Sequence, residues 1–220
     1  MDKKINLIFD FDSTFIQLET IEILAEYALK DHKNKNSIIK KISNMTNLAM
    51  SGQLSFNRAL SDRISLLDLK EIHIKETLDF LLDKISPSFD LNLEFIKKNK
   101  SSCYIISGGF KDIIYPIVHK FGFIEKNIFA NNFIYNKDGT IKLDNSNPLS
   151  KDNGKNLIAK NIKGYNIIIG DGYTDYEVKK NGNAMKFIQY VENINRKELN
   201  NKADLIAKNF QDIINFLNHV

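Results

Sequence analysis

Cysteine is nearly absent from this sequence, since Cys103 is the only one among 220 residues. No disulfide can therefore form within the chain, and no cluster of cysteine thiolates can hold a metal ion. Long apolar runs are also missing. Two carboxylates interrupt the apolar stretch that begins at Ile5, which excludes a secretory signal or a membrane-spanning helix there. We expect a cytoplasmic protein with no membrane partner.

Concentrated positive charge is absent as well. The 31 lysines and arginines and the 27 aspartates and glutamates are spread along the chain, and the formal net charge is +4. Without an arginine-rich arm or a long lysine block, the sequence predicts no nucleic-acid partner, although a small positive excess favours an anionic substrate. With 43% hydrophobic residues, the chain is expected to bury a substantial core.

Three short β-type runs predict strands buried on both faces of a parallel sheet, as in α/β proteins. They are Ile5–Phe9, Cys103–Ile106 and Tyr165–Ile169, and each is followed by glycine or polar residues and then by helical spacing. Because ligands of open α/β sheets bind where loops leave the carboxyl ends of strands, the three loops should converge. A hairpin around Asn136–Thr140 and a short helix over Phe210–Val220 are also predicted.

A helical insertion interrupts this pattern. Between Glu19 and Ile85 the apolar residues recur at spacings of three and four, and no β-rich run appears. We predict a helical cap domain at residues 17–86, inserted into a sheet domain made of residues 1–16 and 87–220. Pro87 resists helix continuation and marks the point where the chain returns to the sheet domain.

The first loop carries two carboxylates two residues apart, Asp10 and Asp12. Such a pair repels unless a cation or a proton lies between its members, and magnesium is the natural hard partner for these oxygens. One carboxylate can attack phosphorus while the other protonates the leaving oxygen and later activates water. The pair alone is equally compatible with capping a turn or a helix start.

The second loop is Ser107-Gly108-Gly109. A hydroxyl followed by two glycines lets the backbone approach an anion closely, and the following helix offers unpaired N–H groups. Taken alone, this motif is also typical of an ordinary tight turn.

The third loop and a preceding lysine complete the set. Asp171, at the end of a strand, could bind the same metal ion as Asp10. Asp175 could support Asp171 without binding the metal itself. Thr174 could donate to phosphate, and Lys155 could reach phosphoryl oxygens or hold Asp10 ionised. The order of the four motifs favours phosphoryl transfer far more than any one of them does.

In this order the motifs resemble those of the haloacid dehalogenase superfamily. FDFDST, IISGG, NGK and GDGYTD match its Asp-x-Asp, Ser/Thr, Lys and Gly-Asp motifs. Over most of its length the chain is similar to the phosphoserine phosphatases of that superfamily, especially in MTNLAMSGQLSFNRALSDRISLL. The resemblance implies an α/β fold with a Rossmann-like core and an inserted helical cap. It also implies a Mg²⁺-dependent phosphatase that acts on a small phosphomonoester as a monomer or homodimer.

The resemblance further implies individual roles. Asp10 would be the nucleophile and a metal ligand, Asp12 the general acid/base and a ligand through its backbone carbonyl, and Asp171 the third protein ligand. The expected substrate-binding residues are Glu19, Met50, Phe56, Arg63, Ser107, Gly108, Gly109 and Thr174, with Lys155 on the phosphoryl group and Asp175 behind the metal ligands. Among them, Glu19 suits a substrate ammonium and Arg63 a substrate carboxylate.

Some positions depart from the phosphoserine phosphatase pattern, and other functions stay open. Tyr173 stands where a smaller residue is common, and Ser51 where glycine is common. A related phosphatase, or a phosphotransferase that passes the phosphoryl group to an alcohol such as homoserine, is compatible with the same motifs. So are an inactive binding protein and a receiver-like signalling domain, although the helical insertion and Asp12 argue against a receiver.

Overall fold

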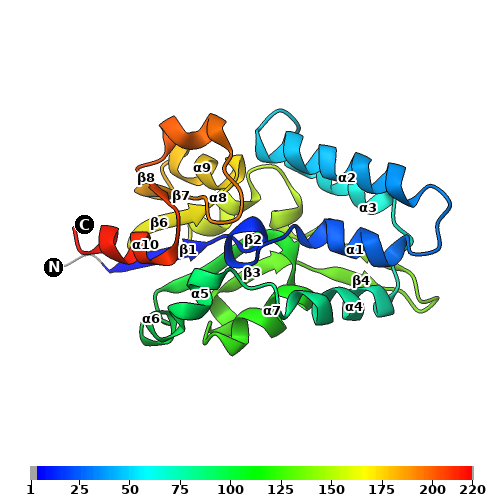
Figure 1. Ribbon diagram of the computed structural model, residues 1–220, viewed down its shortest axis with the longest axis horizontal. Coiled ribbons are helices and arrows are strands. Elements are labelled where there is room, and N and C mark those ends of the chain that lie inside the picture. Colours follow the sequence, from blue (N-terminus) through cyan, green and yellow to red (C-terminus); the bar gives the residue numbers. More distant parts are fainter. Residues whose placement is uncertain (1–3, 220) are drawn as a thin grey trace.

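A computed structural model of the chain describes residues 4–219. Six strands form one sheet in the order β3-β2-β1-β6-β7-β8, and all neighbours run parallel. The strands are β1 (Ile5–Phe9), β2 (Cys103–Phe110), β3 (Ile128–Asn131), β6 (Tyr165–Gly170), β7 (Lys186–Tyr190) and β8 (Leu205–Ala207). In the register, Phe9 at the end of β1 lies opposite Ile105 and Ile169. The three predicted strands are thus adjacent, and their carboxyl ends share one edge (Figure 1).

The second predicted strand is longer than expected. We predicted a loop at Ser107–Gly109, but β2 continues to Phe110 and helix α7 begins at once with Lys111. The pairing with β3 shifts register between Ile106 and Phe110. Because glycine has no side chain, Gly108 and Gly109 allow the backbone to depart from regular strand pairing while it stays extended.

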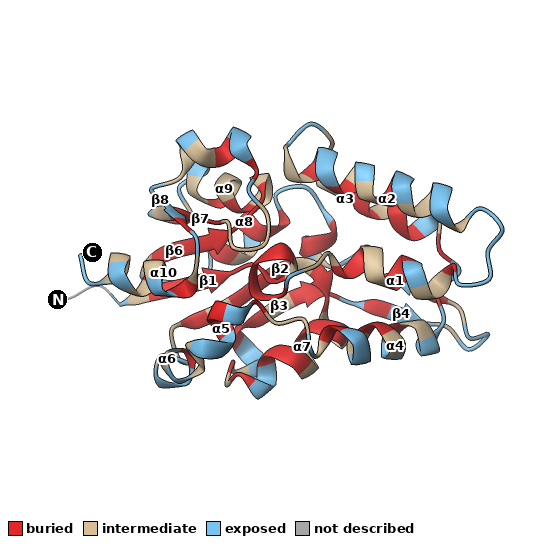
Figure 2. Cartoon of the chain, in the orientation of Figure 1, coloured by how far each residue is buried: buried red, intermediate tan, exposed pale blue. Residues whose placement is uncertain are grey.

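Helices cover both faces of the sheet, as expected of a doubly covered parallel sheet. They are α5 (Pro87–Leu91), α6 (Leu93–Lys98), α7 (Lys111–Lys120), α8 (Gly154–Ala159), α9 (Tyr173–Lys180) and α10 (Phe210–Leu217). Successive residues of β1 alternate between two cores. Leu7 and Phe9 join the core under α5, α6, α7 and α10, whereas Ile8 joins the core under α8 and α9. Figure 2 shows the strands between these layers as mostly buried.

The predicted helical insertion is confirmed. Its helices are α1 (Thr20–Ala28), α2 (Lys35–Met50), α3 (Phe56–Ser65) and α4 (Glu71–Leu81), and together they form the cap at one end of the molecule (Figure 1). The two chain segments that lead into and out of it are joined by an isolated antiparallel bridge between Ile16 and Ile85. The proposed division of domains at 16/17 and 86/87 falls beside this bridge and stays a prediction.

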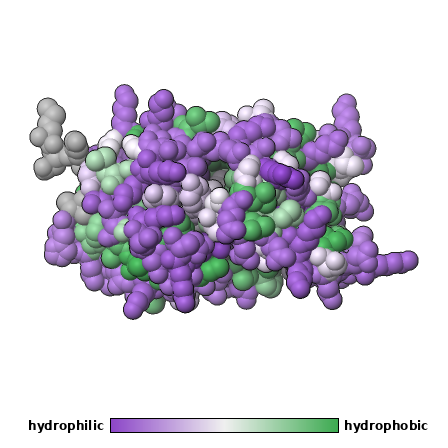
Figure 3. All heavy atoms as spheres, turned by 90° about the horizontal axis from the view of Figure 1, so that it is seen from above, coloured by the Kyte–Doolittle hydropathy of each residue, from purple (hydrophilic) through white to green (hydrophobic). Residues whose placement is uncertain are grey.

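The other sequence-based expectations are largely met. The predicted hairpin forms from β4 (Phe133–Tyr135) and β5 (Ile141–Leu143), which pair antiparallel. The C-terminal helix ends at Leu217, and Val220, which the prediction included, lies outside the described residues. No helix within residues 4–219 has the length and apolarity to cross a membrane. The face in Figure 3 is mostly hydrophilic, with scattered apolar groups.

A cluster of phenylalanine rings fills the larger core beside β1. Phe89 lies at its centre, with ring centroids 5.5 Å from Phe9, 5.0 Å from Phe15 and 4.8 Å from Phe210. All four rings are fully buried. The cluster therefore supports both β1 and the turn that follows it, which carries the first acidic motif.

We predict that Phe89→Ala lowers the free energy of unfolding by about 3–5 kcal/mol, because it removes a large buried ring and leaves a cavity. Urea denaturation followed by circular dichroism measures this. The matched control is Leu91→Ala in the same helix, which is 84% exposed and should change stability by less than about 0.5 kcal/mol. Equal losses in the two variants would contradict this account of the core.

Candidate active site

Three carboxylates gather at the carboxyl edge of the sheet. Asp10 follows β1 and donates its backbone N–H to Ile169 O on the neighbouring strand (2.9 Å), and Asp171 follows β6. Carboxylate oxygens of Asp10, Asp171 and Asp175 all lie within 4.8 Å of one another, and all three residues are buried. Burial raises the pKa of Asp171 to about 7 even though Arg196 lowers it. Such a concentration of negative charge requires cations.

The turn after β1 holds the first acidic motif in an irregular conformation, η1 (Phe11–Phe15). Asp10 Oδ1 accepts the Phe11 N–H (2.7 Å), and Ser13 adopts a left-handed backbone with φ of 53°. Asp12 Oδ1 accepts hydrogen bonds from the Thr20 N–H (3.1 Å) and the Thr20 hydroxyl. Burial and the nearby Glu19 raise the pKa of Asp12 well above its usual range, which suits a carboxyl that carries a proton.

Lys155 supplies the buried positive charge next to Asp10. Its Nζ lies 2.7 Å from Asp10 Oδ2 and 2.7 Å from Asp175 Oδ1. Burial lowers the pKa of Lys155, but these two carboxylates outweigh that effect and raise it above its ordinary value. The lysine therefore stays charged and fixes the orientation of both carboxylates. Asp175 Oδ2 also accepts the Gly172 N–H (3.2 Å), which braces the third loop.

The end of β2 presents the hydroxyl and glycines of the second motif. Ser107 Oγ accepts the Gly109 N–H (3.0 Å), and the serine is buried. Gly108 lies directly under Phe56 of the cap, because a Cβ added there would be 2.3 Å from Phe56 Cζ. Only glycine leaves room for this ring. The hydroxyl of Thr174 is buried and makes no hydrogen bond within residues 4–219, so it is available to a ligand.

A small cavity of about 30 Å³, here called the inner cavity, joins these groups to the cap. It is lined by almost every residue predicted from the sequence, namely Asp10, Asp12, Glu19, Met50, Phe56, Arg63, Ser107, Gly108, Gly109, Lys155, Asp171 and Thr174. The exception is Asp175, which lies behind Lys155 and Gly172. The cap and three strand ends thus contribute to one enclosed site.

The two predicted recognition residues of the cap already have protein partners. Arg63 is buried and donates through Nε to Ala59 O (3.0 Å) and through Nη1 to Thr46 Oγ1 (2.7 Å). A guanidinium has five N–H donors, so these contacts hold the side chain while others remain for a carboxylate. Glu19 Oε1 accepts the Ser13 hydroxyl (2.7 Å) and lies 3.4 Å from Arg196 Nη2.

Arg196 is the residue that the sequence analysis missed. It follows β7, and its Nε lies 2.7 Å from Asp171 Oδ2 while its Nη1 lies 3.3 Å from Asn47 Oδ1 on the cap. It therefore links an acidic strand end to Glu19 and Asn47. No motif surrounds it in the sequence. The one available signal was its rarity, because the chain has only three arginines in a lysine-rich composition.

The donor set at the sheet edge fits a metal ion. Asp10, Asp171 and Asp175 offer hard, buried carboxylate oxygens close enough to share one cation, and such oxygens are the usual ligands of small divalent cations. Within residues 4–219, the side-chain group includes Asp175, which we had placed behind the ligands. The Asp12 carboxylate is not part of it. A ligand role for the Asp12 backbone carbonyl stays a prediction.

Comparisons with known proteins show what the chain is similar to. A family model described as haloacid dehalogenase-like hydrolase matches residues 7–179. The chain is 32% identical over 215 residues to the chloroplastic phosphoserine phosphatase of Arabidopsis thaliana, covering 95% of this chain and 70% of the relative. It is 34% identical to the phosphoserine phosphatase of Methanocaldococcus jannaschii over 199 residues, or 85% and 87% of the two chains.

A solved structure is also similar. The phosphoserine phosphohydrolase-like protein from Francisella tularensis superposes with a TM-score of 0.88 at 34% identity, covering 97% of this chain and 100% of the other.

We predict that Arg196→Met lowers the free energy of unfolding by about 2–4 kcal/mol, because it leaves the Asp171 and Glu19 carboxylates buried beside fewer cations. Urea denaturation in the presence of a chelator measures this effect without competition from metal ions. Arg58→Met is the matched control, since the Arg58–Asp62 pair is solvent-exposed with a separation of 3.7 Å, and should cost less than about 0.5 kcal/mol. An equal, small effect of both variants would mean that Arg196 contributes no net stabilisation.

Proposed function

We propose that this chain, which belongs to the haloacid dehalogenase-like hydrolase family, is a Mg²⁺-dependent phosphoserine phosphatase that hydrolyses O-phosphoserine to serine and phosphate. The observation that carries this proposal is the inner cavity, where a complete phosphoryl-transfer set meets Glu19 and Arg63 from the cap. Relatives named phosphoserine phosphatase, similar over most of both chains, support the same substrate. This reaction is the last step of serine biosynthesis.

The first chemical step is attack by Asp10 on phosphorus. Lys155 holds the Asp10 carboxylate through Oδ2, and the backbone N–H of Phe11 fixes its other oxygen. As the new bond forms from the carboxylate to phosphorus, the bond from phosphorus to the serine oxygen breaks. Asp12 gives its proton to that oxygen, so serine leaves as a neutral alcohol.

The second step is hydrolysis of the aspartyl phosphate. Asp12, now a carboxylate, takes a proton from water while the water oxygen attacks phosphorus and the bond to Asp10 breaks. Asp12 is thereby protonated again and Asp10 is restored. Ser107, Thr174 and Lys155 would hold the phosphoryl oxygens through both steps, because all three line the inner cavity.

We assign the metal ligands to Asp10 and Asp171, with the backbone carbonyl of Asp12 as a third. Asp175, whose carboxylate lies in the same buried group, would orient Lys155 and the third loop. When bound, Mg²⁺ would supply the positive charge that offsets repulsion between an anionic nucleophile and a phosphoryl group.

Cellular location and assembly are further parts of the proposal. A cytoplasmic enzyme is supported by Cys103, a lone cysteine that lies fully buried in β2. Burial also raises the pKa of this thiol to about 12, so it is unreactive. A monomer or a homodimer is the expected assembly.

Asp10→Asn should abolish turnover without unfolding the protein. The amide has nearly the same shape as the carboxylate but is not a nucleophile, and we expect kcat to fall by more than about a thousandfold. Phosphate release from phosphoserine measures this, and circular dichroism checks the fold. Asp62→Asn, on the exposed surface of α3, is the matched control and should keep wild-type activity. A folded Asp10→Asn protein with substantial turnover would exclude Asp10 as the nucleophile.

The substrate assignment predicts a specific pattern among truncated substrates. The wild type should prefer phosphoserine to phosphoethanolamine, which lacks the carboxylate, and to 3-phosphonooxypropanoate, which lacks the ammonium. Arg63→Lys should reduce mainly the first preference, and Glu19→Gln mainly the second, each by about 10- to 100-fold in the ratio of kcat/KM values. If the wild type shows no preference for phosphoserine, the proposed substrate is wrong.

A further inference from the structure

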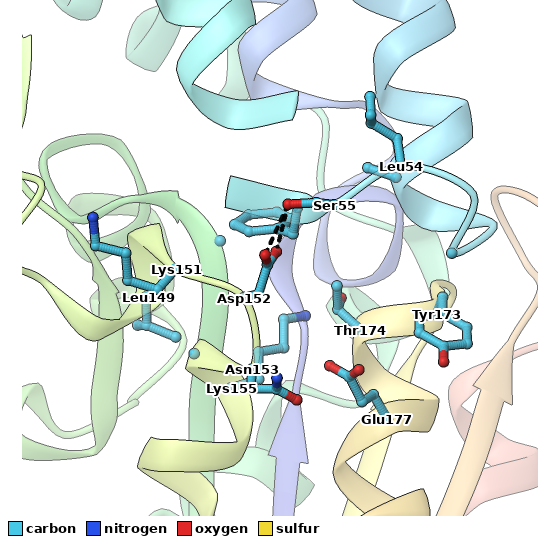
Figure 4. Close-up of a pocket in the computed structure, with 15 residues that line it drawn as sticks. Leu54, Ser55, Leu149, Lys151, Asp152, Asn153, Lys155, Tyr173, Thr174 and Glu177 are labelled. Carbon is cyan, nitrogen blue, oxygen red and sulfur yellow. Dashed lines mark hydrogen bonds between the residues drawn. The ribbon is translucent and has the colours of Figure 1, made fainter. Parts of the chain in front are cut away.

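A second and larger cavity adjoins the inner one along the seam between the cap and the sheet domain. This outer cavity has a volume of about 300 Å³ and shares Phe56, Gly108, Lys155 and Thr174 with the inner cavity. Figure 4 shows Lys155 and Thr174 between Asp152 on one side and Tyr173 on the other. The inner cavity has room for about two water molecules. Any bulkier part of a phosphomonoester held by Lys155 must therefore use the outer cavity or displace the cap.

Tyr173 closes one side of this outer cavity by contact with the cap. A Cβ added to Gly52 would lie 2.8 Å from two ring carbons of Tyr173, so the ring packs directly on the glycine backbone. Gly52 follows α2 and has a φ of +80°, a conformation that other residues rarely adopt. Tyr173 is the first residue of α9, immediately after the acidic loop. The ring thus spans from the catalytic loop to the cap.

Neighbouring residues hold the Tyr173 ring in this position. Lys202 Nζ lies 5.7 Å from the ring centroid, and Lys180 Nζ lies 3.4 Å from the phenol oxygen. The ring of Tyr176 meets it edge-on at 5.9 Å. Cation–aromatic contacts of this kind contribute modestly at exposed sites, but together they keep the ring across the seam. Tyr173 is therefore a fixed wall of the outer cavity.

The rest of the outer cavity is mixed, with Ala49, Leu54 and Leu149 as apolar walls and charged groups of both signs beside them. Lys151, Asp152, Asn153 and Glu177 line it from the loops around α8 and from α9. The serine part of phosphoserine would bind Glu19 and Arg63, which line only the inner cavity. A large apolar leaving group that extended into the outer cavity would leave its charged groups without partners. Because the Tyr173 ring lines this cavity, it takes up room that a larger leaving group would need.

We propose that Tyr173, packed against Gly52, sets the width of the outer cavity and is the residue that restricts this phosphatase to small phosphomonoesters. The proposal rests on the phosphomonoester hydrolase function above and assigns to this chain a determinant of leaving-group size. Tyr173 makes no contribution to the chemical steps. Its removal should thus change which substrates are accepted more than how the phosphoryl group is transferred.

The test compares kcat/KM for p-nitrophenyl phosphate, a bulky aryl substrate, with kcat/KM for phosphoserine. Tyr173→Ala should raise this ratio by at least about tenfold. Tyr173→Phe keeps the ring and should leave the ratio within about threefold of the wild type. Tyr115→Ala is the matched control, because this half-buried tyrosine of α7 stacks on His119 and does not line the outer cavity.

The outcomes separate the two proposals. If the wild type hydrolyses another small phosphomonoester better than phosphoserine, the proposed substrate is wrong, and the ratio is formed with that better substrate instead. An unchanged ratio in a folded Tyr173→Ala protein would overturn the role of Tyr173. So would an equal rise in Tyr115→Ala, which would indicate a general loosening of the fold. If Tyr173→Ala does not fold, Tyr173→Leu keeps apolar packing on Gly52 and should still raise the ratio.

Discussion

Lys155 lies 2.7 Å from the carboxylates of both Asp10 and Asp175 in the interior of the protein. Burying an ionised carboxylate costs free energy unless a cation accompanies it. If the cation is removed, the buried carboxylate is left without compensation and the protein is strongly destabilised. This single ammonium therefore permits two of the acidic loops to approach one another. Arg196 pairs with both Asp171 and Glu19 and so permits these two carboxylates to lie close together as well. The two cations come from separate segments after the helical insertion, so the charge balance of the site fixes how distant parts of the chain pack.

The parallel sheet explains why much of this site could be predicted from the sequence. Strands buried on both faces appear as short apolar runs, and β1 pairs with both β2 and β6. The polar residues after those runs must then share one edge. On this reasoning the sequence alone predicts that Asp10, Ser107 and Asp171 lie close together. Helical spacing likewise predicted the cap. An amphipathic helix shows the same apolar spacing in its sequence regardless of which element its apolar face packs against.

What the sequence did not predict depends on tertiary contacts. The pattern at Ser107–Gly109 is typical of a turn, yet pairing with β3 keeps the segment extended. Arg196 lies in an irregular segment with no periodicity, and its importance comes only from the buried carboxylates that surround it. Arg63 was predicted as a substrate ligand, and its contact with Ala59 is local, within α3. Its anchoring by Thr46, however, depends on how α2 packs against α3, which the local sequence does not encode.

Two reciprocal aromatic contacts join the cap to the sheet domain along the seam between them. Phe56 of the cap lies on Gly108 of the core, and Tyr173 of the core lies on Gly52 of the cap. In each case a glycine admits a ring that any side chain would displace. Polar contacts lie beside them. Asp152 accepts a hydrogen bond from the Ser55 hydroxyl (2.8 Å; Figure 4) and another from the Asn57 N–H (3.0 Å) at the start of α3.

These contacts involve the same loops that carry the chemistry. Asp152 precedes Lys155 in one loop, and Tyr173 follows Asp171 in another. A ligand larger than the inner cavity must extend into the outer cavity or separate the cap from these loops. In the second case, closure would restore both contacts as it encloses the ligand. Because rings on glycines tolerate little displacement, closure is complete only around ligands that fit. The same packing that excludes water from the nucleophile therefore also limits which phosphomonoesters can be enclosed beside it.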